Sequence, residues 1–171
     1  NFLKSQGVSK GDRVSGLLPR TPELIITILA TWRIGAVYQP LFTAFGPKAI
    51  EHRLQLAQSK LVVTDIGNRD KLQEVDGCPA IVTVTGAKGT GLYQGDYSFW
   101  AEVNRQSDQC ELVMMNIQDP FLLMFTSGTT GPAKPLQVPL KALIAFGGYM
   151  QDAIGLRAED SFWNIADPGW A

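Results

Sequence analysis

The chain is poor in the residues that build most zinc and nucleophilic sites. It has two cysteines and one histidine among 171 residues. Cys78 and Cys110 lack the Cys-x-x-Cys spacing of a metal or redox site and form no disulfide framework. His52 stands between Glu51 and Arg53 in a predicted helix, where a solvated side chain is the ordinary interpretation. The sequence therefore predicts neither a zinc centre nor a Ser-His-Asp triad.

Charge of one sign and long apolar runs are also lacking. The 15 basic and 16 acidic residues leave a net charge of −1, so no broad basic field for nucleic acid is indicated. No apolar run approaches the ~20 residues of a membrane span, and no signal-peptide pattern is recognisable. Together with the isolated cysteines, this favours a cytoplasmic protein with no nucleic-acid partner.

The hydrophobic content of 45% and the length are enough for one globular domain with a sizeable core. The sequence begins at Asn1 without methionine and stops at Ala171, directly after the largely apolar A-D-P-G-W. Chain ends are usually polar and loosely held. We therefore expect the chain to be cut from a larger protein.

Hydrophobic periodicity predicts alternating strands and helices. Val14–Leu18 is predicted as a strand, followed by a helix with Thr21 as N-cap and Pro22 at its first position. The apolar stripe expected for this helix is Leu24, Ile25, Ile28, Leu29 and Trp32.

A second unit of the same kind follows. Ala36–Leu41 is predicted as a strand, and Pro47 opens a helix whose Ile50, Leu54 and Ala57 share one face. Further predicted strands are 61–64, 81–84, 121–125, 136–138 and 161–165, and further helices 66–75, 97–104 and 140–156. Successive strand–helix–strand units predict an α/β fold, a mostly parallel sheet flanked by helices.

The most informative stretch is Asp119–Pro135. Phe121–Phe125 is an unbroken apolar run, as in a strand buried on both faces of a parallel sheet. It is followed by small hydroxyls, glycines and a cation: Thr126, Ser127, Gly128, Thr129, Thr130, Gly131 and Lys134. Glycines allow backbone N–H groups to converge on an anion, hydroxyls donate further hydrogen bonds, and lysine supplies charge. This composition is suited to a polyphosphate.

The spacing differs from that of the common phosphate loop, which needs Gly, four residues, then Gly-Lys-Ser/Thr. Five residues after Gly128 comes Ala133, and Lys134 is followed by Pro135. Ser127 lacks the G-x-S-x-G elbow of a hydrolase. From composition alone, an ordinary polar loop remains the alternative.

The order of the residues is more specific. T-S-G-T-T-G-x-x-K after an apolar strand resembles the phosphate-binding signature of the adenylate-forming (AMP-binding) acyl-CoA synthetase family. Four other segments resemble this family in its order: G-D-R-V at 11–14, L-P-R-T-P-E-L at 18–24, G-A-V-Y-Q-P-L at 35–41 and W-N-I-A-D-P-G-W at 163–170. The resemblance covers nearly the whole chain and is closest to the acetyl-CoA and medium-chain acyl-CoA synthetases.

The resemblance implies that 1–171 is an incomplete N-terminal subdomain of the adenylate-forming fold. It would be part of the large AMP-binding domain, with the phosphate loop at 126–134 and the C-terminal domain absent. The full-length protein would be an AMP-forming acyl-CoA ligase, which activates a short- or medium-chain carboxylic acid with ATP and transfers it to coenzyme A. Its ligands would be ATP, Mg²⁺, coenzyme A and the acid.

The resemblance also implies roles for individual residues. Thr126–Gly131 and Lys134 would hold the β- and γ-phosphates, with Lys134 as the catalytic cation. Asp167 and Trp170 would lie near the acyl pocket; for Asp167, a turn before Pro168 is an equal alternative. Arg69 would lie near a coenzyme A contact, although a plain surface charge is the favoured interpretation.

The sequence departs from the family where Ala133-Lys134-Pro135 replaces Pro-Lys-Gly. Pro135 fixes φ and removes an N–H, which either stiffens the loop's exit or removes a phosphate donor. The resemblance implies that the elements that hold adenine, ribose and magnesium lie outside 1–171, so we expect no turnover by this chain alone. The alternatives are a stand-alone nucleotide- or phosphate-binding module and a remnant that self-associates, as a homodimer or larger, through an exposed sheet edge.

Overall fold

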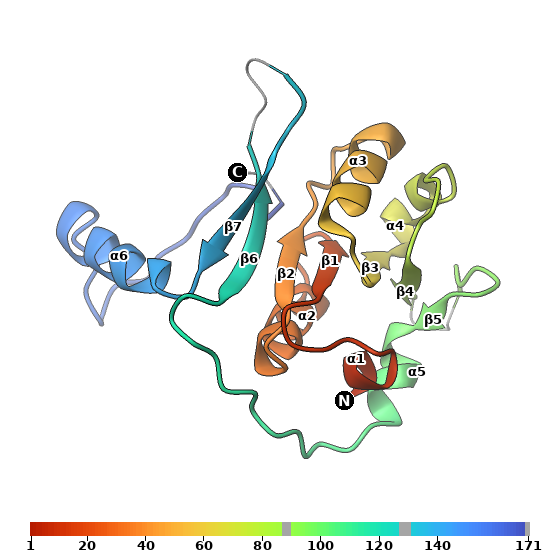
Figure 1. Cartoon of the computed structure of the whole chain (residues 1–171), viewed down its shortest axis with the longest axis horizontal. Coiled ribbons are helices and arrows are strands. Elements are labelled where there is room, and N and C mark those ends of the chain that lie inside the picture. Colours follow the sequence, from red (N-terminus) through yellow and green to blue (C-terminus); the bar gives the residue numbers. More distant parts are fainter. Residues whose placement is uncertain (87–89, 127–130, 170–171) are drawn as a thin grey trace.

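A seven-stranded sheet forms the centre of the computed structural model, which describes residues 1–86, 90–126 and 131–169 (Figure 1). The strands are β1 (Arg13–Leu17), β2 (Val37–Pro40), β3 (Leu61–Asp65), β4 (Ala80–Val84), β5 (Tyr97–Ser98), β6 (Pro120–Phe125) and β7 (Pro135–Pro139). Their order across the sheet is β5-β4-β3-β1-β2-β6-β7. Every neighbouring pair is parallel except β6 and β7, which are antiparallel. The predicted α/β class and mostly parallel sheet are therefore confirmed.

Helices cover both faces of this sheet. They are α1 (Phe2–Ser5), α2 (Pro22–Arg33), α3 (Pro47–Ala57), α4 (Ile66–Arg69) with a 3₁₀ turn at Asp70–Leu72, α5 (Phe99–Asn104), and α6 (Ala142–Gly148) with a π turn at Tyr149–Ala153. α1, α2 and α5 pack with Leu61 and Val63 of β3 in one core cluster. α3 and the 3₁₀ turn pack with Val62 in another. Successive strand residues point to opposite faces, so β3 is buried from both sides.

The helix α2 begins as predicted but buries a different face. Thr21 precedes it in an extended conformation, and Pro22 is its first residue. Ile25 and Leu29 are 54% and 57% exposed, so the predicted stripe is wrong at these two positions. Thr27 and Thr31 are buried instead. Each threonine hydroxyl donates to the carbonyl four residues earlier at 2.7 Å, so burial leaves no unpaired hydroxyl.

The helix α3 agrees with its sequence pattern. Pro47 is its first residue, and Ile50, Leu54 and Ala57 are all buried. Ile50 and Leu54 contribute to the cluster with β3, while Ala57 packs with Val37 of β2 and with Leu123 and Phe125 of β6. This helix therefore lies over the strands that lead to the predicted phosphate loop.

Three predictions about the later elements are wrong in detail. The strand β6 was expected to be buried on both faces, but Leu122 and Met124 on one face are only half-buried, and the chain returns after β6 as the antiparallel strand β7. The helix expected at 97–104 begins at Phe99, because Tyr97 and Ser98 pair with β4. The helix expected at 66–75 ends at residue 72.

The end of the chain departs furthest from prediction. The helix expected at 140–156 is present only as α6 and its π turn, and 161–165 is not a strand. Trp163 and Ile165 are 76% and 81% exposed, and the segment 161–165 pairs with none of the described strands. Figure 1 shows α6 projecting away from the sheet. In the part of the chain that the structure describes, no helix has the length and apolar character needed to cross a bilayer.

We predict that Ile50→Ala lowers the free energy of unfolding by about 2–5 kcal/mol, since the side chain is fully buried between α3 and the sheet. Urea denaturation measures this change. Leu56→Ala, on the same helix but at a side chain 49% exposed, is the matched control and should change stability by about 0.5 kcal/mol or less. Equal losses in the two variants would contradict the assigned core.

Candidate functional site

The candidate site lies at the edge where the parallel strands end. β1, β2 and β6 are neighbours with the same direction, so the segments that follow them leave from one edge of the sheet. These are 18–21 before α2, 41–46 before α3, and the loop between β6 and β7. Ligands in open parallel sheets gather beyond the carboxyl ends of the strands.

The predicted phosphate loop is the loop of a β-hairpin. Phe125 of β6 lies opposite Pro135 of β7. The N–H of Thr126 donates to the carbonyl of Lys134 at 3.0 Å, and the N–H of Lys134 donates to Thr126 Oγ1 at 3.2 Å. The two ends of the loop are therefore tied together by two reciprocal hydrogen bonds.

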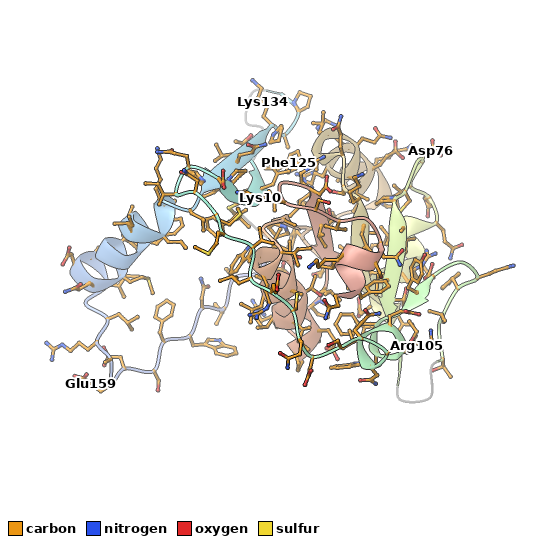
Figure 2. The ribbon with its side chains drawn as sticks, turned by 60° about the horizontal axis from the view of Figure 1, so that its bottom comes forward. Lys10, Asp76, Arg105, Phe125, Lys134 and Glu159 are labelled. Carbon is orange, nitrogen blue, oxygen red and sulfur yellow. The ribbon has the colours of Figure 1, made fainter. Side chains whose placement is uncertain are left out.

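The described part of the loop faces open space. Thr126, Gly131 and Lys134 are exposed, and a Cβ atom built on Gly131 would have no neighbour within 4 Å. Figure 2 shows Lys134 at the outer end of the hairpin with Phe125 nearer the body of the sheet. The Thr126 hydroxyl accepts one hydrogen bond and still has its own hydrogen to donate. The predicted site residues Ser127, Gly128, Thr129 and Thr130 lie outside the described residues.

Pro135 is the first residue of β7, a position where strands tolerate a missing N–H. A proline also biases the preceding residue toward extended conformations. Lys134 is thus restricted from its C-terminal side by Pro135. Pro135 was expected either to stiffen the end of the loop or to remove a phosphate donor. Its position at the start of β7 favours the first consequence.

Asp167 is held over the end of β2. Its Oδ2 accepts from the Thr43 hydroxyl at 2.9 Å, and its Oδ1 accepts from the N–H of Gly169 at 2.7 Å. Arg20 Nη2 donates to the carbonyls of Ile165 and Ala166. Asp167 therefore forms the expected turn, and a role beside an acyl group stays a prediction. Trp170 lies outside the described residues.

A cleft of about 590 Å³ adjoins Asp167. Its lining comes from the segment before α2, from the first turn of α2, and from 163–168; it includes Arg20, Leu24, Ile25, Trp163, Asp167 and Pro168. None of the described hairpin residues lines it. Among the described residues, the cleft beside Asp167 is therefore formed by the 163–168 segment and the start of α2, without the hairpin.

Tyr38 of β2 lies beneath this region. Its side chain is 3% exposed, and its hydroxyl packs against Gly16 so closely that any side chain at position 16 would collide with it. Burial, and to a smaller extent the charge of Asp167, raises the pKa of Tyr38 above its ordinary value. The buried phenol therefore holds its proton more firmly than an exposed tyrosine does.

Arg69 is in a different environment from the one favoured by its sequence. Its Nε and Nη2 donate to the two carboxylate oxygens of Asp96 at 2.6 and 2.8 Å, and Thr83 Oγ1 donates to the same carboxylate at 2.6 Å. The side chains of Arg69 and Asp96 are 8% and 3% exposed. The interpretation as a plain surface charge is wrong, and a coenzyme A contact stays a prediction. No local pattern connects Arg69 with Asp96.

His52 was also misjudged from sequence. It is half-buried, and its Nε2 lies 3.1 Å from the carbonyl oxygen of Ala133 in the candidate loop. The flanking residues Glu51 and Arg53 give no indication of such a contact in the sequence. Among the residues described, no group of three or more His, Cys, Asp or Glu side chains is arranged to hold a metal ion.

A mostly parallel sheet covered by helices, with a hairpin at its carboxyl edge, defines an α/β protein. The chain belongs to the AMP-binding enzyme family, whose model matches residues 1–171.

Similar proteins agree with this assignment. An acyl-CoA synthetase of Brucella canis is 58% identical, with a TM-score of 0.95 over 100% of this chain and 31% of its own. An acetyl-coenzyme A synthetase of Helicobacter pylori (strain G27) is 35% identical over 99% of this chain and 28% of its own length. The acetoacetyl-CoA synthetase of Streptomyces lividans, 24% identical with a TM-score of 0.84 over 98% of this chain and 28% of its own, supports the fold alone. The chain thus spans less than a third of the length of these relatives.

We predict that Arg69→Met lowers the free energy of unfolding by about 3–5 kcal/mol, because it leaves the buried Asp96 carboxylate without its cation. Arg105→Met is the matched control, since the Arg105 side chain is 71% exposed in its pair with Glu102 and should contribute about 1 kcal/mol or less. Urea unfolding of both variants tests this. A small loss for Arg69→Met would show that the ion pair is not closed in solution.

Proposed function

We propose that this chain is the N-terminal part of the AMP-binding domain of an AMP-forming acyl-CoA synthetase. The enzyme would activate a short- or medium-chain carboxylic acid with ATP and transfer the acyl group to coenzyme A. The observation that carries the proposal is the tied hairpin loop of Thr126–Lys134 at the carboxyl edge of the sheet, in a chain of the AMP-binding family. The names of the similar synthetases support the choice of reaction.

In the first half-reaction, a carboxylate oxygen bonds to the α-phosphorus of ATP, and the bond from this phosphorus to the bridging oxygen breaks. The electron pair stays with the departing pyrophosphate, whose negative charge must be stabilised. The exposed Lys134 ammonium and the Thr126 hydroxyl are described groups that suit this task. By sequence, Ser127–Gly131 would add hydroxyl and backbone donors. In the second half-reaction, the thiol of coenzyme A attacks the acyl carbonyl and displaces AMP.

Magnesium enters this proposal as part of the Mg–ATP substrate. Charge neutralisation on the phosphates is the chemistry that it supplies. The described residues offer no cluster of carboxylates for a resident ion. The Lys134 ammonium, a cation, would contact the phosphates and not the metal.

The remaining assignments are proposals on the same basis. Asp167, which adjoins the cleft of about 590 Å³, and Trp170 would lie beside the acyl group. Arg69 would contribute to coenzyme A binding through the surface around its ion pair with Asp96. We also propose a cytoplasmic location.

A second candidate is a phosphate-binding module that self-associates without turnover. It is favoured by the apolar side chains exposed on α6 and after it, namely Leu143, Ile144, Phe146, Tyr149, Phe162, Trp163 and Ile165. Surfaces of this kind promote association between chains. In the synthetase, later parts of the same protein would cover them. Light scattering over a wide concentration range tests self-association, which a strictly monomeric chain would contradict. Acid-dependent exchange by the longer protein would contradict a module without turnover.

We predict that Lys134→Ala slows acid-dependent ATP–pyrophosphate exchange by roughly 10- to 150-fold in the longer protein. A charged hydrogen bond contributes roughly 1.5–3 kcal/mol, and the ammonium group would be lost from the phosphates. Lys141→Ala, at another exposed lysine beyond the same hairpin, is the control and should leave exchange unchanged. Unchanged exchange in Lys134→Ala would remove this residue from the mechanism.

We predict that the 171-residue chain by itself does not catalyse exchange, whereas the longer protein does so with short- or medium-chain acids. Positioning of the carboxylate against the α-phosphate supplies roughly 7–11 kcal/mol of the barrier reduction, and the hairpin holds only the departing end of ATP. The assay compares both proteins across a panel of acids. Acid-dependent exchange by the short chain would overturn the fragment proposal, and no exchange by the longer protein would overturn the synthetase proposal.

A further inference from the structure

We propose that His52 of α3 is a positioning residue for the candidate phosphate loop, holding the peptide group that orients Lys134. The inference deepens the proposed function and rests on it. It starts from one contact: His52 Nε2 lies 3.1 Å from the Ala133 carbonyl oxygen. A carbonyl oxygen only accepts, so Nε2 carries the hydrogen and donates it.

The Ala133 carbonyl belongs to the same peptide group as the Lys134 N–H. Its oxygen accepts from His52, and its N–H donates to Thr126 Oγ1 at 3.2 Å. A peptide group is planar, so hydrogen bonds at both ends fix its orientation. The next peptide group is held as well, because its carbonyl accepts from the Thr126 N–H at 3.0 Å. Lys134 therefore stands between two restrained peptide groups.

His52 is not on the face of α3 that packs into the core. Ile50 and Leu54 form the buried face, and His52 is two residues from each, so it points away from that face. It is nevertheless half-buried, and its Nε2 contacts the hairpin at Ala133. His52 is thus directed at the loop and not at the sheet.

The next residue of α3 contacts the other end of the loop. The Arg53 guanidinium lies 4.0 Å from the ring centre of Phe45 and 5.4 Å from that of Phe125, the residue before Thr126. Arg53 is anchored to its own helix, since Nη1 donates to the Ala49 carbonyl at 3.0 Å. Consecutive residues of one helix therefore hold both ends of the loop, and α3 acts as its rigid support.

The experiment measures ATP–pyrophosphate exchange in the longer protein for wild type, His52→Ala and His52→Gln. Without the donor, the Ala133–Lys134 peptide can rotate, and misdirection of the ammonium group should lower kcat by roughly 10- to 100-fold with a smaller change in the KM for ATP. Glutamine retains an N–H donor at a similar reach, so it should restore kcat to within about threefold. Gln55→Ala, exposed on the same helix, is the control and should match wild type.

A second measurement keeps this inference separate from the proposed function. In the ¹⁵N-labelled 171-residue chain, His52→Ala should shift the amide signals of Lys134 and Thr126 and speed their hydrogen exchange at least tenfold, whereas His52→Gln should not. Unchanged amides, or equal kinetic losses for alanine and glutamine, would overturn the role of His52. Wild-type protein without acid-dependent exchange would overturn the proposed function, while the amide signals would still decide whether His52 holds the peptide.

Discussion

The pairing of β6 with β2 is the contact on which the candidate site depends. It places Leu122 beside Tyr38, two residues that are far apart in sequence. Trp32 of α2 reinforces it, because its indole N–H donates to the Phe121 carbonyl at 2.8 Å and its ring packs edge-on against Phe121. Through this pairing, the loop after β6 and the segment after β2 emerge at the same edge. The pairing therefore adds to the contacts of α3 that hold the hairpin in place.

The segment 41–46 connects the parts of that edge. Its Thr43 hydroxyl binds Asp167, and its Phe45 packs against Phe42 and Arg53. The C-terminal segment is thereby attached to the end of β2, and the hairpin is attached to α3. The segment 41–46 thus lies between the proposed phosphate-binding and acyl-binding parts. Its contacts hold groups from distant strands in fixed positions relative to one another.

Local patterns predicted most of the first half of the fold. β1, β2, β3, α2 and α3 follow from apolar periodicity and from proline at the first helical position, because these signals act within a few residues. The exposure of Ile25 and Leu29 and the antiparallel course of β7 depend on which neighbours surround them. The segment 161–165 has the apolar composition of a strand, but it pairs with no described strand and therefore forms none.

The phosphate site stays a prediction, and local sequence is its source. The composition and order of 126–134 indicate phosphate chemistry, because glycine, hydroxyl and lysine act locally. The pairing of Arg69 with Asp96 and the contact of His52 with Ala133 join residues from separate elements, so no spacing rule reveals them. Arg69 and His52 are both polar side chains that were predicted from sequence to be solvated. Their partners become apparent only when the sheet is assembled.

The most direct test of the account is a titration of the ¹⁵N-labelled chain with inorganic pyrophosphate, with AMP as the comparison ligand. The account predicts that pyrophosphate shifts the amide signals of Thr126, Gly131 and Lys134 first, and that AMP, which lacks the β- and γ-phosphates, shifts them far less. Shifts centred on another part of the sheet, or equal responses to the two ligands, would contradict a phosphate site in the β6–β7 loop.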